Sequence, residues 1–250
     1  MPVDRPPHRI DAPRFDLDRF AADGYAVLRS FVEPERAAQL ASLLERAPER
    51  DPGPNPLSLD SMRFASNLFY GTPELVELLG APPVIEIVTA VLGPDVWVRW
   101  DQAVWKGPGA PTFPWHQDNG YTELDAEHLQ LWLALTSSTA DNGGLVVAPG
   151  GHRRRLPHRW VGNHVVATPT GPSETIEAAP GDAVVFSSLL PHTTGPNRTG
   201  RTRLAYVAEF LPLDAPDRSV SPPHLVVAAG GLPRPGFVDL TPRWDSQESR

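Results

Sequence analysis

The sequence predicts an α+β protein in which a double-stranded β-helix, the jelly-roll or cupin-like barrel, is braced by N-terminal helices. Two observations carry this prediction. Apolar residues at helical spacing are confined to the first third of the chain, and short strand-like segments with tight turns fill residues 95–212. No internal repeat or linker interrupts residues 1–250, so we expect a single domain. An immunoglobulin-like sandwich would leave the helical third unexplained.

The helical elements are expected mainly within residues 16–93. Each has a start or stop signal: an N-capping aspartate, a proline in the first turn, or a glycine after the last turn. These signals predict helices over residues 17–23, from residue 34 onward, from residue 73 to Gly80 and over 83–92, with a strand over 25–28 and a loop over 48–57.

Strands are expected over residues 96–106, 129–138, 145–148, 175–179, 183–187 and 202–211. Two of the turns between them are typical of hairpins, Asp141-Asn-Gly-Gly144 and Pro180-Gly-Asp182. Each is expected to join two paired strands. The proline-rich tail, 213–250, is expected to cover the barrel loosely.

Composition excludes several classes of function. The formal net charge of −8 argues against a nucleic-acid partner, which would need a basic face. No apolar stretch is long enough to cross a bilayer, and the first residues lack a basic flank followed by an apolar run. Because the chain has no cysteine, it has no disulfide and no thiolate metal site. We expect a cytoplasmic monomer or homodimer that acts on a small molecule.

The segment Trp115-His-Gln-Asp118 is the first chemical motif. Residues two apart in an extended segment point to the same face, so His116 and Asp118 can share one metal ion. A second histidine would complete the two-His, one-carboxylate face that leaves positions open for a co-substrate and O2 on Fe(II). By itself, His-x-Asp also fits a hydrogen-bonded pair in a loop.

The third ligand has several candidates among the eight histidines. His192 is the best placed, because it follows the apolar strand 183–186 and precedes a Gly-Pro-Asn loop. His128, at the start of a strand, is a weaker rival, and spacing does not exclude His164.

An oxygenase that uses 2-oxoglutarate needs a cation for the distal carboxylate, with a hydroxyl beside it. Thr194 offers the hydroxyl, and Arg198, Arg201 and Arg203 are the candidate cations, of which Arg203 lies within a strand. Lys106 is the only lysine among 22 basic residues. A lysine kept where arginine is otherwise used marks a functional candidate, although chance survival of one surface lysine is the alternative.

Motifs across most of the chain resemble the phytanoyl-CoA dioxygenase family of Fe(II)/2-oxoglutarate oxygenases. They are Phe20-Ala-Ala-Asp-Gly-Tyr-Ala-Val-Leu28, Lys106, Trp115-His-Gln-Asp118, Leu131-Trp-Leu-Ala-Leu135, Asn142-Gly-Gly-Leu145, Pro149-Gly-Gly-His152, Pro180-Gly-Asp182, His192 and Arg203. Gly151 stands where the family usually has serine. The resemblance implies a barrel that binds Fe(II), 2-oxoglutarate and O2.

The resemblance also implies roles for individual residues. His116, Asp118 and His192 would be both the metal ligands and the catalytic centre. The family's distal histidine and its 2-oxoglutarate arginine lie eleven positions apart, which favours Arg203, with Thr194 and Lys106 beside it. Gln102 shares a strand face with Lys106 and joins the same pocket. Related halogenases have a small residue at the position of Asp118, so oxygenation is favoured.

Substrate identity is the least determined feature. The acidic loop 119–127 suits a cationic or polyhydroxylated substrate such as an amino acid, an amino sugar or an oligosaccharide, and a plain solvated loop is the alternative. We name Asn119, Tyr121, Glu123 and Trp132 as candidate substrate contacts, with core packing as the alternative for Trp132. The expected reaction is hydroxylation, ring closure or desaturation in specialised-metabolite biosynthesis. The rival classes are a jelly-roll metal protein or isomerase that does not use O2, and a scaffold that has lost its metal.

Overall fold

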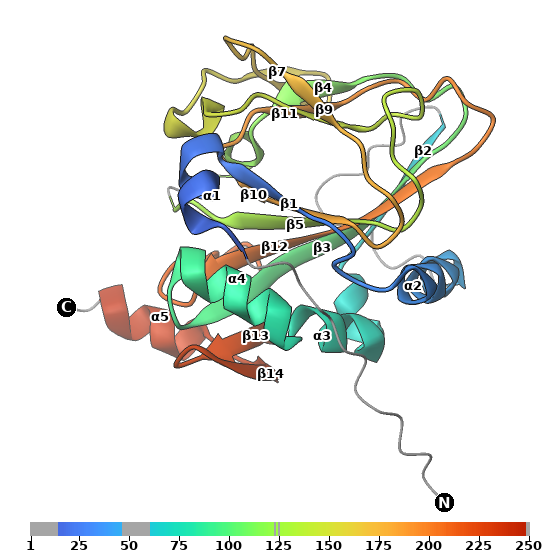
Figure 1. Cartoon of the computed structure of the whole chain (residues 1–250). Coiled ribbons are helices and arrows are strands. Elements are labelled where there is room, and N and C mark those ends of the chain that lie inside the picture. The colour runs from blue at the N-terminus through green and yellow to red at the C-terminus, as the bar shows by residue number, and fades with distance from the viewer. Residues whose placement is uncertain (1–14, 47–60, 123, 125, 249–250) are drawn as a thin grey trace, which may run out of the picture.

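A computed structural model describes residues 15–46, 61–122, 124 and 126–248 of the chain. Two antiparallel sheets face each other, and most of the helices lie against the outer side of the larger one (Figure 1). This is the predicted jelly roll with bracing helices. The predicted loop over 48–57 lies outside the described residues.

The helices of the first third lie close to the predicted positions. The α-helices are α1 (Leu17–Asp23), α2 (Pro34–Arg46), α3 (Pro73–Leu79), α4 (Pro82–Leu92) and the C-terminal α5 (Thr241–Glu248), with short 3-10 helices η1 (Leu68–Gly71), η2 (Asp118–Gly120) and η3 (Gly151–Arg153). Asp16 caps α1 by accepting a hydrogen bond from the Arg19 amide, and Gly24 ends it in the left-handed conformation at φ 83°.

The larger sheet has eight strands in the order β1-β10-β5-β12-β3-β13-β14, with β2 also paired to β3. Its strands are β1 (Tyr25–Leu28), β2 (Met62–Ser66), β3 (Val96–Lys106), β5 (Leu129–Ala134), β10 (Ala183–Ser187), β12 (Arg203–Pro212), β13 (His224–Ala229) and β14 (Leu232–Val238). Helices α2, α3 and α4 pack on its outer face, where residues such as Leu40, Leu75 and Ile85 are buried.

The smaller sheet has the order β4-β11-β6-β9 and lies over the inner face of the larger one. Its strands are β4 (Phe113–His116), β6 (Leu145–Val147), β9 (Glu174–Ile176) and β11 (His192–Thr194), and a separate ribbon pairs β7 (Arg159–Val161) with β8 (His164–Val166). At one end the two sheets meet in a second apolar cluster that includes Trp132, Leu145 and Phe186.

The two predicted hairpins were wrong. The turn at Gly143 connects β5 of the larger sheet to β6 of the smaller one, and the turn at Gly181 lies between β9 and β10, which also belong to different sheets. Both glycines have positive φ, 87° and 93°, so the local turn chemistry is present. Turn chemistry sets the chain direction, but pairing follows the burial of each strand's apolar face.

The C-terminal tail also differs from the prediction. Instead of a loose cover, it adds β13 and β14 to the larger sheet and ends in α5. Trp244 of α5 is buried against Trp97, and its indole nitrogen donates to the Leu213 carbonyl at 3.0 Å. Pro233 and Pro235 lie in β14, an edge strand that pairs on one side only, and Pro242 lies in the first turn of α5.

Strand β2 was not predicted. It pairs along β3 from Met62 to Ser66. Within the described residues, no single helix is long and apolar enough to cross a membrane; the pair α3 and α4 passes on length and composition but is bent by 53°.

Candidate active site

Three side chains predicted as metal ligands come together at one end of the paired strands β4 and β11 of the smaller sheet. His116 ends β4 and lies directly opposite His192, the first residue of β11. Asp118 follows one extended residue later, and its Oδ1 lies 3.4 Å from His116 Nε2 and 3.7 Å from His192 Nε2. One ligand atom from each lies within 4.8 Å of the other two, in the part of the chain that the structure describes. This donor set suits one Fe(II).

Both imidazoles are oriented by their own backbone. His116 Nδ1 lies 2.8 Å from the Pro114 carbonyl oxygen, and His192 Nδ1 lies 3.0 Å from that of Leu190. A carbonyl oxygen only accepts, so each Nδ1 carries the proton and each Nε2 presents a lone pair toward Asp118.

The protonation states favour metal binding. Burial, helped by the neighbouring His116, lowers the pKa of His192 to about 4, so this ring is neutral at pH 7. Burial by itself would raise the pKa of Asp118, but His192 and His116 hold it below its usual value. A neutral histidine and an ionised carboxylate are the forms that bind a cation.

A second group of predicted residues lies beside the metal ligands. We call Lys106, Thr194 and Arg203 the Arg203 corner. Lys106 ends β3 and is registered with Arg203, the first residue of β12. Lys106 Nζ donates to Thr194 Oγ1 at 2.9 Å. Because Thr194 accepts this bond, its own hydroxyl hydrogen is free to donate to a third group.

Arg203 is 1% exposed yet poorly satisfied. Its Nη2 donates to the Gly143 carbonyl at 3.1 Å, while its Nε and Nη1 have no hydrogen-bond partner. Burial lowers the pKa of Arg203 to about 10, and burial together with Arg203 lowers that of Lys106 to about 7. Buried, unpartnered guanidinium nitrogens mark a place for a carboxylate.

The triad and this corner open into one cavity of about 900 Å³. Three strands of the larger sheet, β5, β12 and β3, form what we call the cavity floor, and the metal ligands face it from the smaller sheet. Along β12, Arg203, Val207 and Glu209 line the cavity, because alternate residues of a strand face the same side.

The remaining predicted residues divide into two groups. Gln102, Tyr121 and Trp132 line the cavity. The Gln102 amide donates to Ser66 Oγ at 3.0 Å, the Tyr121 ring packs edge-on against His116, and Trp132 lies between Val207 of β12 and Val184 of β10.

Asn119 is not among the cavity-lining residues. Its amide nitrogen donates to the Leu124 and Ala126 carbonyls, both at 3.2 Å, so the side chain stabilises the loop that follows it. Glu123 and Asp125 lie outside the described residues. Glu127, the other acid of this loop, accepts a hydrogen bond from Ser187.

The rival histidines have other surroundings. The His164 ring packs edge-on against Phe113, with ring centroids 5.2 Å apart. His128 is fully buried, and its Nε2 lies 2.7 Å from Glu209 Oε1.

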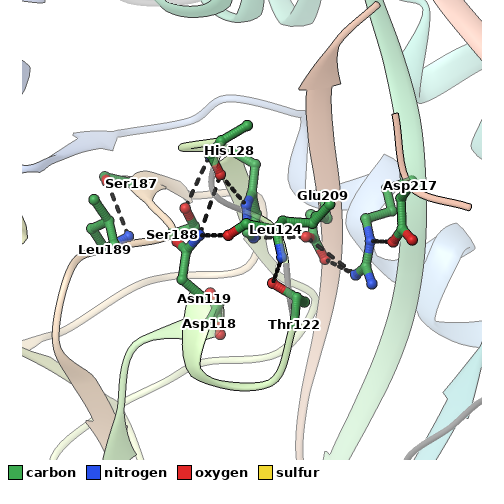
Figure 2. A network of polar contacts seen from close by, with 12 residues as sticks. Asp118, Asn119, Thr122, Leu124, His128, Ser187, Ser188, Leu189, Glu209 and Asp217 are labelled. Carbon is green, nitrogen blue, oxygen red and sulfur yellow. Dashed lines mark hydrogen bonds and ion pairs between the residues drawn. The ribbon is translucent and has the colours of Figure 1, made fainter. Parts of the chain in front are cut away.

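Sequence reasoning missed the charged network to which His128 belongs. Arg99 Nη1 lies 3.2 and 3.3 Å from the two carboxylate oxygens of Glu209, and Arg99 Nε contacts Asp217. Figure 2 shows Glu209 between His128 and the guanidinium that reaches Asp217. Alternation along β12 places Glu209 on the same face as Arg203, but the partners of Glu209, Arg99 and His128, come from two distant segments.

Comparisons with known proteins agree with this geometry. The family model described as Phytanoyl-CoA dioxygenase (PhyH) matches residues 20–205. Dioxygenase lolE1 of Epichloe uncinata is 28% identical over 154 residues, which are 58% of this chain and 60% of the relative. The peroxisomal phytanoyl-CoA dioxygenase of Mus musculus is 27% identical over 212 residues, 78% of this chain and 61% of the relative. The chain thus spans about three fifths of the length of these curated relatives.

Among solved structures, EvdO2 from Micromonospora carbonacea var. aurantiaca, complexed with 2-oxoglutarate, superposes with a TM-score of 0.68 at 25% identity. The match covers 82% of this chain and 94% of that protein.

Proposed function

This chain belongs to the phytanoyl-CoA dioxygenase family, and we propose that it is an Fe(II)- and 2-oxoglutarate-dependent oxygenase. It would hydroxylate, or oxidise by ring closure or desaturation, a small polar metabolite of specialised metabolism. We further propose that it works as a single cytoplasmic domain, as a monomer or homodimer. The observation that carries the proposal is the buried corner at Arg203, which lies beside a three-ligand metal face and has two guanidinium nitrogens without partners.

The metal would be held by His116 Nε2, His192 Nε2 and an oxygen of Asp118. When bound, Fe(II) with 2-oxoglutarate and O2 supplies an oxidant strong enough to break a C–H bond, while 2-oxoglutarate becomes succinate and CO2. The two backbone carbonyls that hold the Nδ1 protons keep both rings aimed at one point.

The Arg203 corner would bind the distal carboxylate of 2-oxoglutarate. Arg203 would supply two parallel N–H donors to one carboxylate, from the unpartnered Nη1 and from the second hydrogen of Nη2, and the Thr194 hydroxyl would supply a third. Lys106 holds Thr194 in place through its hydrogen bond and adds a positive charge when protonated. An isomerase that does not use O2 would have no need for such a corner, and this favours the oxygenase over that rival.

Anaerobic titration tests the proposal. Purified protein with Fe(II) should develop a weak visible charge-transfer band on addition of 2-oxoglutarate. Asp118→Ala should bind Fe(II) at least about tenfold more weakly and lose the band, because one of three charged or polar ligands is gone. Asp214→Ala, which removes an exposed carboxylate, is the matched control and should behave as wild type. A metal-loaded wild type without the band would overturn the proposal.

A further inference from the structure

The cavity floor has two ends with different chemistry. At one end, Arg203 lies opposite Lys106; at the other, Glu209 lies opposite Trp100 on β3 and Gln130 on β5. We call Trp100, Glu209 and Gln130 the distal row. The two ends are six positions apart along β12, about 20 Å of extended strand. Because the Arg203 corner is suited to the co-substrate, the distal row is left for the substrate.

A β-bulge builds the distal row. The register of β3 against β12 shifts at Glu209, so Trp100 pairs with Glu209, Val98 pairs with Phe210, and Arg99 has no partner on β12. Two consecutive residues, Arg99 and Trp100, therefore line the cavity, which a regular strand would not allow. The bulge is what brings the Arg99 guanidinium to Glu209.

The acids at this end of the cavity, Glu209 and Asp217, are already paired. Glu209 contacts Arg99 through both carboxylate oxygens and His128 through Oε1, and Arg99 also contacts Asp217. All four side chains are at most 14% exposed. Glu209 therefore has little capacity to bind an incoming ammonium group. A carboxylate would approach Glu209 and Asp217, which would repel it.

Gln130 differs from these paired groups. It is 2% exposed, it lines the cavity, and its Oε1 accepts no hydrogen bond. A buried amide oxygen without a partner is costly unless a ligand supplies a donor. A hydroxyl both donates and accepts, so it would satisfy the Gln130 amide in either orientation of its oxygen and nitrogen.

The walls around Gln130 are suited to a ring. Trp100 lines the same cavity and is half-buried, so part of its aromatic surface is open; Tyr70 also lines the cavity but packs against Phe69 and Phe237. Ser219, whose hydroxyl donates to Asp217, and Ser221 also line the cavity, on the segment before β13. Aromatic faces with a few polar groups are the usual lining for a ring that carries hydroxyls.

We propose that the distal row is the substrate subsite, and that it selects a neutral, hydroxylated ring, with a hydroxyl on the Gln130 amide and the ring against Trp100. This rests on the proposed oxygenase function and narrows its substrate class. It disfavours the amino acid and the amino sugar, because Glu209 is already paired with Arg99 and His128 and so cannot neutralise their ammonium groups.

Three matched probes test the selection: phenyl β-D-glucopyranoside, its 2-amino-2-deoxy analogue and its uronate. Binding is measured by quenching of tryptophan fluorescence, since Trp100, Trp132 and Trp160 line the cavity. It is measured with metal-free protein and again after anaerobic loading with Fe(II) and 2-oxoglutarate. We expect the glucoside to bind at least about fivefold more tightly than either charged analogue, the effect of one satisfied hydrogen bond.

Two variants of one residue assign the effect. Gln130→Leu should remove the preference for the glucoside, and Gln130→Glu should shift it toward the amino analogue, because a free carboxylate then faces the ring. Gln39→Glu, the same change on the exposed face of α2, should leave all three affinities unchanged.

A preference for a charged probe, equal binding of all three, no quenching by any of them, or an unchanged preference in both Gln130 variants would overturn the inference. The charge-transfer band of the wild type is read separately. If the band is missing while the glucoside preference holds, the oxygenase proposal fails and the assignment of Gln130 stands.

Discussion

The two ends of the cavity floor carry opposite charge arrangements. At Arg203, two basic side chains lie side by side and two guanidinium nitrogens are unpartnered. At Glu209, each acid has a basic partner, and the unpartnered group is a neutral amide. One end is electrostatically incomplete until an anion binds; the other is complete before any ligand arrives. We therefore expect the first end to be optimised for binding at the expense of stability, and the second to contribute to both.

The largest expected effect is on stability, at the distal row. Arg99→Leu would leave Glu209 and Asp217 buried without their shared cation, and breaking such a pair costs about 3 kcal/mol or more in free energy of unfolding. Chemical denaturation of metal-free protein measures it. Arg19→Leu, in an exposed pair with Asp23, is the control and should cost under about 1 kcal/mol. Equal losses in the two variants would show that the distal row is not a buried network.

Arg203→Leu should have the opposite pattern. It removes a buried charge that has no counterion, so the free energy of unfolding should stay level or rise. Affinity for 2-oxoglutarate should fall about tenfold to a hundredfold, since a charge-assisted bidentate contact is lost. Calorimetry under anaerobic conditions with Fe(II) measures the affinity. Arg198→Leu changes an exposed arginine nearby and should alter neither quantity. An Arg203 variant that is less stable but binds normally would reverse the comparison.

The smallest expected effect is a pH dependence at Lys106. Burial lowers its pKa to about 7 in the free protein, so above pH 7 the amine is mostly neutral. A bound carboxylate favours the protonated form, so at pH 8 binding of 2-oxoglutarate should take up a proton, and affinity should weaken by up to about tenfold per pH unit above 7. Calorimetry in buffers of different ionisation enthalpy counts the proton. Lys106→Met should abolish the uptake; if uptake persists in this variant, another group is responsible.

Lys106 also has a stability signature. Its folded-state pKa lies below the usual lysine value, so the unfolded chain binds more protons between pH 7 and about 10.5. The free energy of unfolding of ligand-free protein should therefore rise across this window, relative to Lys106→Met.

The sequence singled out the residues that meet at the Arg203 end of the cavity, because their signals are local. His116 and Asp118 are two residues apart, Thr194 follows His192 at the same spacing, and a lone lysine stands out from composition alone. The helix over Leu17–Asp23 also follows from local signals, the capping Asp16 and the terminating Gly24, after which the strand over Tyr25–Leu28 begins.

The distal row could not be predicted from the sequence, because its signals are not local. Its network joins Arg99, His128, Glu209 and Asp217 from segments with no shared pattern, and it depends on one shift of register. The sequence also did not show which strands pair around Gly143 and Gly181. Both positions have strong turn signals, but the strands on either side belong to different sheets. Local chemistry predicts that the chain turns, but only the packing of the apolar clusters decides which sheet the next strand joins.

The bulge at Arg99 also reverses the parity of β3. Before it, the even-numbered residues Val96 and Val98 face the core beneath the sheet; after it, the even-numbered Gln102 and Val104 face the cavity, and Lys106 reaches Thr194. A single inserted residue therefore decides which side chains in the rest of the strand face the core and which face the cavity. Deleting it would not trim one end of the cavity but would exchange the two faces of the strand all the way to the lysine. Whether β3 has an odd or an even number of residues therefore decides which side chains reach the cavity, as much as the identity of those residues does.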